Sequence, residues 1–223
     1  MEIEPDVSRE MFDQGRRRRF GIYRGEPQEI PFWQHMVRTR RDPWGYREKF
    51  DYEFPGEPIW CFCRNGATHT FLNLRSGPCL VSIGGEHEDF YDPDFMIYND
   101  VVIRDLNGGI KIFGFPEDEF PPTDFHTATV VDVDIYIIGG LGYQDARDPM
   151  ITPVYRLSLD DMIIQKLQTT GDVPGWIYEH QALFLKERTI LVAGGSKINY
   201  DYQSEPNFHT YEFHVSTLTW HRR

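Results

Sequence analysis

The sequence predicts an all-β repeat protein in which three copies of one antiparallel unit are stacked against each other. Two adjacent glycines end an apolar run at Gly84-Gly85, again at Gly139-Gly140 and again at Gly194-Gly195, with a step of 55 residues both times. A fixed period of this size is typical of a supersecondary unit that packs against copies of itself. Before each glycine pair, two apolar runs flank a polar turn, which indicates a β-hairpin.

Each repeat continues with two further strands, so four antiparallel strands are expected in each copy. The hairpins are expected in THTFLNLRSGPCLVSIGG, FHTATVVDVDIYIIGG and HQALFLKERTILVAGG. The third strands are expected in IYNDVVI, PVYRLSL and HTYEFHV, and the fourth in IKIFGF, IIQKLQT and LTWHRR. An earlier closing strand is expected in IWCFCR, around Trp60. One such sheet cannot bury both of its faces alone, whereas stacked sheets can.

These features, recurring in phase, resemble the kelch repeat, which is the unit of one class of β-propeller. Besides the glycines, the matching residues are the histidines His69, His126 and His180, the third-strand tyrosines Tyr98, Tyr155 and Tyr211, and Trp220. Ile112 and Ile164 depart from the family, which usually has tryptophan nearby. The resemblance implies a kelch-like β-propeller over residues 58–223, with three recognisable four-stranded blades and the preceding closing strand. Residues 1–57 form a short, partly helical N-terminal extension.

The blade count leaves three arrangements open. Propellers typically have four to eight blades, so three repeats do not fill a known ring. Residues 1–57 supply a further sheet, or the chain forms an open arc, or two chains complete a six-bladed ring as a homodimer. Cyclic dimers are the commonest symmetric oligomers.

The N-terminal extension breaks the 55-residue period. The apolar residues of FWQHMV are spaced for one face of a helix that begins near Pro31 and ends by Pro43. A second short helix is expected in WGYREKFDYEF. The basic run Arg16 to Arg19 is a possible nucleic-acid or localisation patch, but docking on the chain's own acidic surface or plain solvation is favoured.

Composition and charge narrow the classes of partner. The net charge is −12, and residues 51–223 hold most of the acidic excess, which argues against binding of nucleic acid by the propeller. No apolar stretch approaches the length of a membrane span, and the acidic start does not read as a secretory signal. Cys61, Cys63 and Cys79 make no even disulfide set, so a reducing, cytoplasmic location is expected. Cys61 and Cys63 are expected to be buried free thiols rather than a metal pair.

Features that occur only once are the candidates for function. An acidic loop follows the first glycine pair, and the resemblance places this loop and the inter-blade loops on one face, which is often the binding face. The loop GFPEDEFPPTDF adds further acids, and TTGDVPGWIYE adds exposed aromatics. The candidate binding residues are Glu86, His87, Glu88, Asp89, Asp92, Asp94, Tyr143, Trp176 and Tyr178.

Three interpretations of this face stay open. It binds a partner protein or a small cationic ligand with aromatic anchors. It holds a metal on carboxylates and His87. Or its acids only keep the surface soluble. The recurring histidines are expected to be structural rather than metal ligands, because each begins the same strand of its own repeat.

The function expected from the sequence is therefore that of a kelch-type binding module without a cofactor. The alternative is an enzyme of isomerase, lyase or hydrolase type, possibly metal-dependent, that uses the acidic loop after Gly85. An acid–base pair such as His87 with Glu88 or Asp92 would serve it. Fold resemblance alone does not decide between the two.

Overall fold

The computed structural model describes residues 6–52, 58–74, 77–87 and 95–223. The chain is mostly β, with 39% of its residues in strands and 12% in helices, and it forms several antiparallel sheets. The predicted all-β class is confirmed at this level. The described residues form no closed barrel or propeller.

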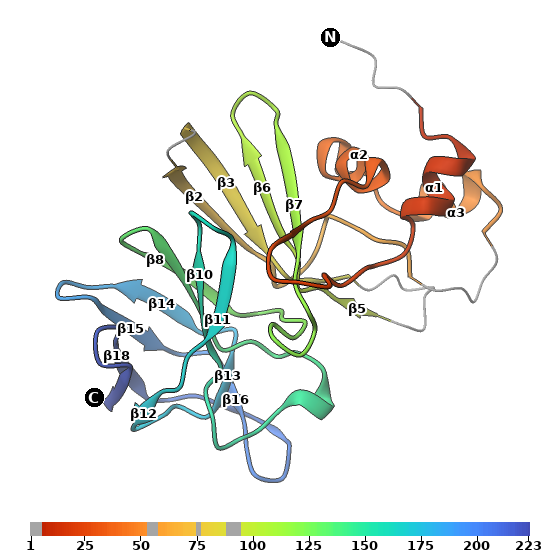
Figure 1. Ribbon diagram of the computed structural model, residues 1–223. Coiled ribbons are helices and arrows are strands. Elements are labelled where there is room, and N and C mark those ends of the chain that lie inside the picture. The colour runs from red at the N-terminus through yellow and green to blue at the C-terminus, as the bar shows by residue number, and fades with distance from the viewer. Residues whose placement is uncertain (1–5, 53–57, 75–76, 88–94) are drawn as a thin grey trace.

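Three large sheets fan out side by side, and one glycine pair directly follows a strand of each (Figure 1). The first sheet has the order β1 (Glu26–Pro27), β7 (Ile110–Gly114), β6 (Val101–Asp105), β3 (Gly77–Ile83), β2 (Thr68–Leu74). The second has the order β11 (Ile163–Lys166), β10 (Val154–Ser158), β9 (Asp134–Ile138), β8 (Thr127–Val131). The third has the order β12 (Thr170–Gly171), β19 (Thr219–Arg222), β18 (Thr210–His214), β15 (Thr189–Ala193), β14 (Gln181–Phe184). The strand β8 lies beside both β2 and β14.

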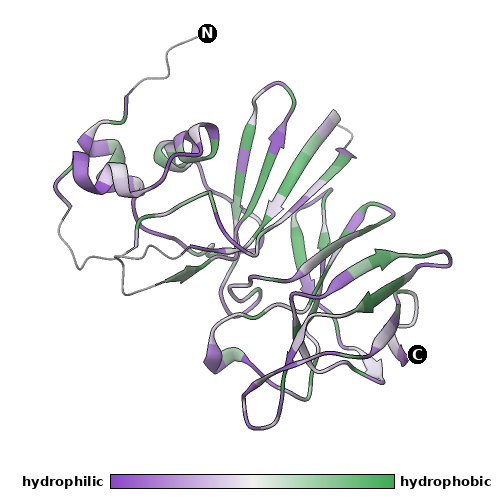
Figure 2. Cartoon of the chain, turned by 180° about the vertical axis from the view of Figure 1, so that it is seen from behind, coloured by the Kyte–Doolittle hydropathy of each residue, from purple (hydrophilic) through white to green (hydrophobic). Residues whose placement is uncertain are grey.

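Short elements fill the loops that follow the glycine pairs. They are β4 (Glu86–His87) paired with β5 (Met96–Ile97), the 3-10 turn η1 (Gln144–Ala146), and the small sheet β13 (Trp176–Tyr178), β16 (Ser196–Ile198), β17 (Ser204–Pro206). Hydrophobic residues are concentrated in the strands of the large sheets, whereas the hairpin between β16 and β17 is largely hydrophilic (Figure 2).

Both faces of the middle sheet are buried, because its strands are apolar on both sides. Ile135, Ile137 and Leu157 pack toward Val81 and Ile103 of the first sheet. The alternate side chains form a separate cluster with the third sheet, made of Val131, Tyr136, Ile138 and Val154 with Ile190, Val192, Phe213 and Trp220. Alternation along a strand thus produces two cores.

The first two glycine pairs hold their sheets against the loops that lead into the next sheets. Gly85 N donates to the carbonyl of Thr123 at 2.8 Å, and Gly140 N donates to the carbonyl of Ile177 at 2.9 Å. All six glycines have positive φ, a conformation that glycine adopts without a steric penalty. The recurring pair is therefore a structural joint between neighbouring sheets.

Three helices form the N-terminal part of the described chain: α1 (Arg9–Gly15), α2 (Pro31–Thr39) and α3 (Trp44–Lys49). The prediction of α2 is confirmed, with Pro31 in its first turn and Arg40 ending it in the left-handed conformation. Its apolar stripe, including Trp33 and Met36, is fully buried.

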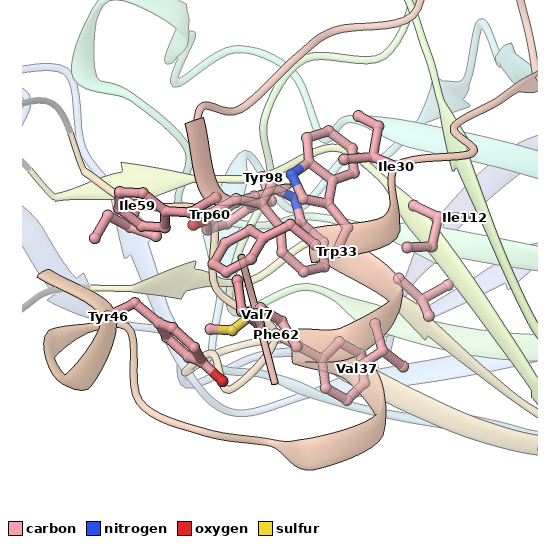
Figure 3. Packing of buried hydrophobic residues seen from close by; sticks show 14 of the residues in the cluster. Val7, Ile30, Trp33, Val37, Tyr46, Ile59, Trp60, Phe62, Tyr98 and Ile112 are labelled. Carbon is pink, nitrogen blue, oxygen red and sulfur yellow. The ribbon is translucent and has the colours of Figure 1, made fainter. Parts of the chain in front are cut away.

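The helices cover part of the outer face of the first sheet. Trp33 stacks on Trp60 with ring centroids 4.7 Å apart and planes 8° apart. Val102 and Ile112 of the sheet belong to the same buried cluster (Figure 3). In a stacked repeat protein, the free face of a terminal unit needs such a cap.

The predicted closing strand around Trp60 is wrong. Residues 58–64 form no strand, and the two residues of β1 pair with β7 at the outer edge instead. Side-chain contacts direct this segment: Trp60 Nε1 donates to Asp100 at 3.0 Å, and Arg64 forms a buried ion pair with the same carboxylate. These side-chain contacts fix the path of the segment, and it does not pair with a neighbouring strand.

Candidate functional site

Two of the recurring histidines tie successive sheets together. His126 Nε2 lies 2.9 Å from Thr68 Oγ1 of the first sheet, and His180 Nε2 lies 2.9 Å from Thr127 Oγ1 of the second. Burial lowers the pKa of His126 to about 3 and that of His180 to about 4, so both rings are neutral at pH 7. This geometry supports the structural interpretation of these two residues.

The alignment of His69 with these two histidines is wrong. Thr68 pairs with the residue before its glycine pair, as Thr127 does in the second sheet, so the register position of His126 belongs to Ala67. The offset arises because β2 and β3 have seven residues each, whereas β8 and β9 have five. His69 instead bonds Ser82 Oγ within its own sheet, at 2.9 Å.

Because of this register, the series of imidazole–hydroxyl contacts between sheets has two different ends. In the third sheet, Gln181 pairs with the residue before the glycine pair and so takes the place of Thr68 and Thr127. In the first sheet, Ala67 therefore stands at the position of the histidine that contacts the preceding sheet. In the third sheet, Gln181 stands at the position of the threonine whose hydroxyl contacts the histidine of the next sheet. The alignment of Tyr98 is wrong for a related reason, because Val102 takes the register position of Tyr155.

The acidic loop is only partly within the described residues. Glu88, Asp89, Asp92 and Asp94 lie outside them. Glu86 and His87 form β4, both are half-buried, and the backbone of Glu86 is held by Asn65 on one side and Ile97 on the other. Nε2 of His87 is buried and has no hydrogen-bond partner in the described part of the chain.

Tyr143 lies next to this loop, as the sequence grouping implied. Its hydroxyl accepts a 2.9 Å hydrogen bond from Ile97 N in β5, and Arg18 Nη1 lies 3.3 Å from the same oxygen. Arg18 also donates to the carbonyl of Ile97, and the Arg16 guanidinium sits 4.4 Å from the ring centroid of Tyr52. These two arginines of the basic run are docked on their own chain.

Trp176 and Tyr178 are buried, so the expectation that both rings are exposed is wrong. They lie in β13, which the hairpin of β16 and β17 covers. Trp176 Nε1 donates to the carbonyl of Leu141 at 3.1 Å, and the Tyr178 hydroxyl bonds Ser204 Oγ. Both rings therefore belong to a small buried cluster and not to the surface of the loops.

The exposed apolar side chains at this end of the molecule were not selected from the sequence. Met150 is 60% exposed, Tyr200 74% and Phe208 85%. Met150 and Tyr200 line a pocket of about 290 Å³ together with His209, which follows Phe208. The available signal was weak: NYDYQSEPNF places aromatics in a polar loop, but the corresponding loop of the first copy, EHEDFYDPDF, has aromatics as well.

Charges around this pocket are mixed. Lys197 Nζ pairs with Glu205 at 3.0 Å, which lowers the pKa of that carboxyl. Arg222 Nη2 lies 3.1 Å from His209 Nδ1. Exposed acids stand in the three loops that surround the pocket: Asp145, Asp148, Asp172 and Asp201. The pocket surface is thus mixed: charged and polar groups lie beside exposed apolar side chains, and further acids stand in the loops around it.

The described residues contain no cluster of three or more His, Cys, Asp or Glu side chains placed to hold a metal ion. Cys61 and Cys79 are buried free thiols, as expected for Cys61, whereas the predicted burial of Cys63 is wrong because it is exposed. Burial raises the pKa of Cys61 to about 12, which leaves it unreactive at neutral pH.

No protein-family model matches the sequence, and no curated protein matches it either. Within the described ranges, none of the helices combines the length and apolarity that a membrane crossing requires.

Proposed function

We propose that the chain is a kelch-type repeat protein, built as an open arc of three blades, that binds a partner protein through its loop end. Three observations support the blades. Each glycine pair follows a strand of its own sheet, strand order repeats from sheet to sheet, and the same glycine and histidine contacts recur between sheets.

The arc is proposed to be complete in one chain. A second copy that closed a ring would have to pack on the outer face of the first sheet, where α2 already buries Val102 and Ile112. The free face of the third sheet carries polar side chains, including Glu212 and His221, which pair across β18 and β19. The same face also carries Leu183, which is 61% exposed, so it is polar only in part. Terminal repeats typically have a polar outer face.

The exposed group Met150, Tyr200 and Phe208 is the observation that carries the binding function. Large exposed apolar side chains beside a pocket with charged and polar walls are typical of an interaction site rather than of general surface. Tyrosine and other aromatic residues supply much of the binding energy at protein interfaces. The excess of acids in the surrounding loops favours a partner segment that presents lysine or arginine beside an apolar side chain.

The enzyme hypothesis draws less support from the described residues. Its described side chains of catalytic type, Glu86 and His87, are both half-buried, and the Nε2 atom of His87 is buried, whereas an acid–base group must reach the substrate. The exposed aromatics, in contrast, are open to a partner.

A photo-crosslinking residue in place of Tyr202, which is also exposed in this loop, identifies the partner in cells. Purified partner is then titrated against the Tyr200→Ala/Phe208→Ala variant. Loss of two anchors of this type is expected to weaken binding about 30-fold or more, with unchanged Tm. Ile22→Ala is the matched control, because Ile22 is also 85% exposed but lies in the N-terminal extension. Equal affinity of the double variant and the wild type refutes the proposal.

A further inference from the structure

An arginine stands in the first sheet where the other two sheets have a core residue. Arg104 pairs with Leu80 in β3, and the same register position is held by Leu157 in the second sheet and Phe213 in the third. Those two side chains are completely buried against the preceding sheet. Arg104 points to the face where no sheet precedes.

This face is only half covered. The residues across it at one level are Phe71, Leu80, Arg104 and Ile110. α2 packs near β7, so Ile110 is partly buried, while Phe71 at the other edge is 61% exposed. Between them lies a pocket of about 360 Å³. Its lining includes Phe71, Leu80, Arg104, Asp105 and Ile110 of the sheet and Arg38 of α2.

Within the described part of the chain, Arg104 forms no hydrogen bond and no ion pair through its side chain. Its Nε atom is buried without a hydrogen bond, and its guanidinium carbon lies 5.2 Å from the ring centroid of Phe62. Burial, and then the charge of Arg40, lower the pKa of Arg104. A buried guanidinium nitrogen without an acceptor is costly, and a bound acceptor would remove that cost.

Other charged side chains also lie near the pocket. Burial and then the charges of Arg104, Arg40 and Arg64 lower the pKa of His69, which lies on the same face as Arg104. The carboxylate of Asp105 lines the pocket, but its Oδ1 already accepts hydrogen bonds from two backbone N–H groups of its own turn. The pocket lining thus holds two cations, Arg104 and Arg38, and the one carboxylate of Asp105, on a chain whose net charge is −12.

We propose that this pocket binds a small organic anion, namely a carboxylate on an aliphatic or aromatic body. The carboxylate would accept hydrogen bonds from Arg104, for which guanidinium and carboxylate geometries match. The apolar body would cover Phe71 and Leu80, which water now contacts. A pocket of this volume with apolar walls and few polar groups is typical of a small-molecule site. An inorganic anion would leave those walls exposed.

Calorimetric titration with octanoate, octanamide and inorganic phosphate tests this site on the full chain. Octanoate is expected to bind at least about 10-fold more tightly than octanamide, because only the carboxylate gains the charged hydrogen bonds. Phosphate is expected to bind more weakly than octanoate. Arg104→Met should lose this preference, and Phe71→Ala should weaken octanoate and octanamide alike.

Arg156→Met is the matched control, since it removes an arginine from β10, the corresponding strand of the second sheet, and should leave octanoate binding unchanged. Equal binding of octanoate and octanamide, or of octanoate by the Arg104→Met variant and the wild type, would overturn the proposal. So would the absence of saturation at about 1 mM, the limit of weak specific binding. A concentration-dependent dimer that Arg104→Met abolishes would assign the pocket to a second copy instead.

Discussion

Replacing Gly139 by alanine should loosen the joint between the second and third sheets. A Cβ atom at this position would lie 2.4 Å from the carbonyl oxygen of Ile177, whereas ordinary contact begins at 3.4 Å. The same oxygen accepts the 2.9 Å hydrogen bond from Gly140 N. The backbone must therefore move by about 1 Å, which breaks a bond of normal length.

Gly194 provides a matched comparison. Its φ of 70° resembles the 66° of Gly139, but no heavy atom lies within 4 Å of a Cβ added there. Alanine at positive φ costs about 1 kcal/mol at both positions. At Gly139 the lost hydrogen bond adds about 1–3 kcal/mol and the overpacking about 1–3 kcal/mol. The expected loss of unfolding free energy is thus about 3–7 kcal/mol for Gly139→Ala and about 1 kcal/mol for Gly194→Ala.

Thermal unfolding by circular dichroism measures this difference. For a chain of this length each kcal/mol lowers Tm by about 2–4 °C, so Gly139→Ala should lower Tm by at least about 6 °C and Gly194→Ala by about 2–4 °C. Equal shifts in the two variants would refute the assignment of the first glycine to an inter-sheet joint, because backbone strain would then account for both.

Two further predictions concern buried polar groups. Because folding lowers the pKa of His126 and His180 below the ordinary value of about 6.5, their contribution to stability is complete above that pH and is lost as pH falls toward 4. Tm should therefore fall more steeply between pH 6.5 and 5 in the wild type than in His126→Gln/His180→Gln, and parallel curves would contradict this. Arg64→Met should cost about 3–5 kcal/mol in urea unfolding, since it leaves Asp100 buried without a counter-ion. Adding Asp100→Asn should recover part of that loss, and no recovery would contradict the charge explanation.

The sequence was informative wherever local pattern decides structure. Apolar spacing after Pro31 predicted α2, and alternation before each glycine pair predicted the hairpins, because burial of one face selects the period. The third- and fourth-strand segments also hold strands in every repeat. These signals act over a few residues and do not depend on distant partners.

Register could not be predicted, because a hairpin's length shifts the residues that face a neighbour without changing the pattern. His69 seemed equivalent to His126, yet the structure gives that position to Ala67. The prediction of a closing strand around Trp60 was wrong for a similar reason. Stacking of Trp60 on Trp33 is a tertiary contact between two segments, and no local sequence motif links them.

Exposure of the candidate site was equally a tertiary property. Trp176 and Tyr178 stand in a loop-like sequence, but β16 pairs with their strand and the hairpin covers them. Tyr200 and Phe208 lie in or next to that hairpin and remain open. The aromatic content of the sequence pointed to this region, while the strand pairing decided which rings face solvent.

The unequal ends of the imidazole–hydroxyl series bear on growth into filaments. Head-to-tail contacts that do not close form open fibres when the two end surfaces match. A copy placed after the third sheet would set Ala67 against Gln181, a methyl group against an amide, and would meet the helices that cover its first sheet. We therefore expect the protein to stay unpolymerised at high concentration. The Ala67→His/Gln181→Thr variant restores the missing imidazole–hydroxyl pair, and it tests whether those two residues help to prevent fibre growth.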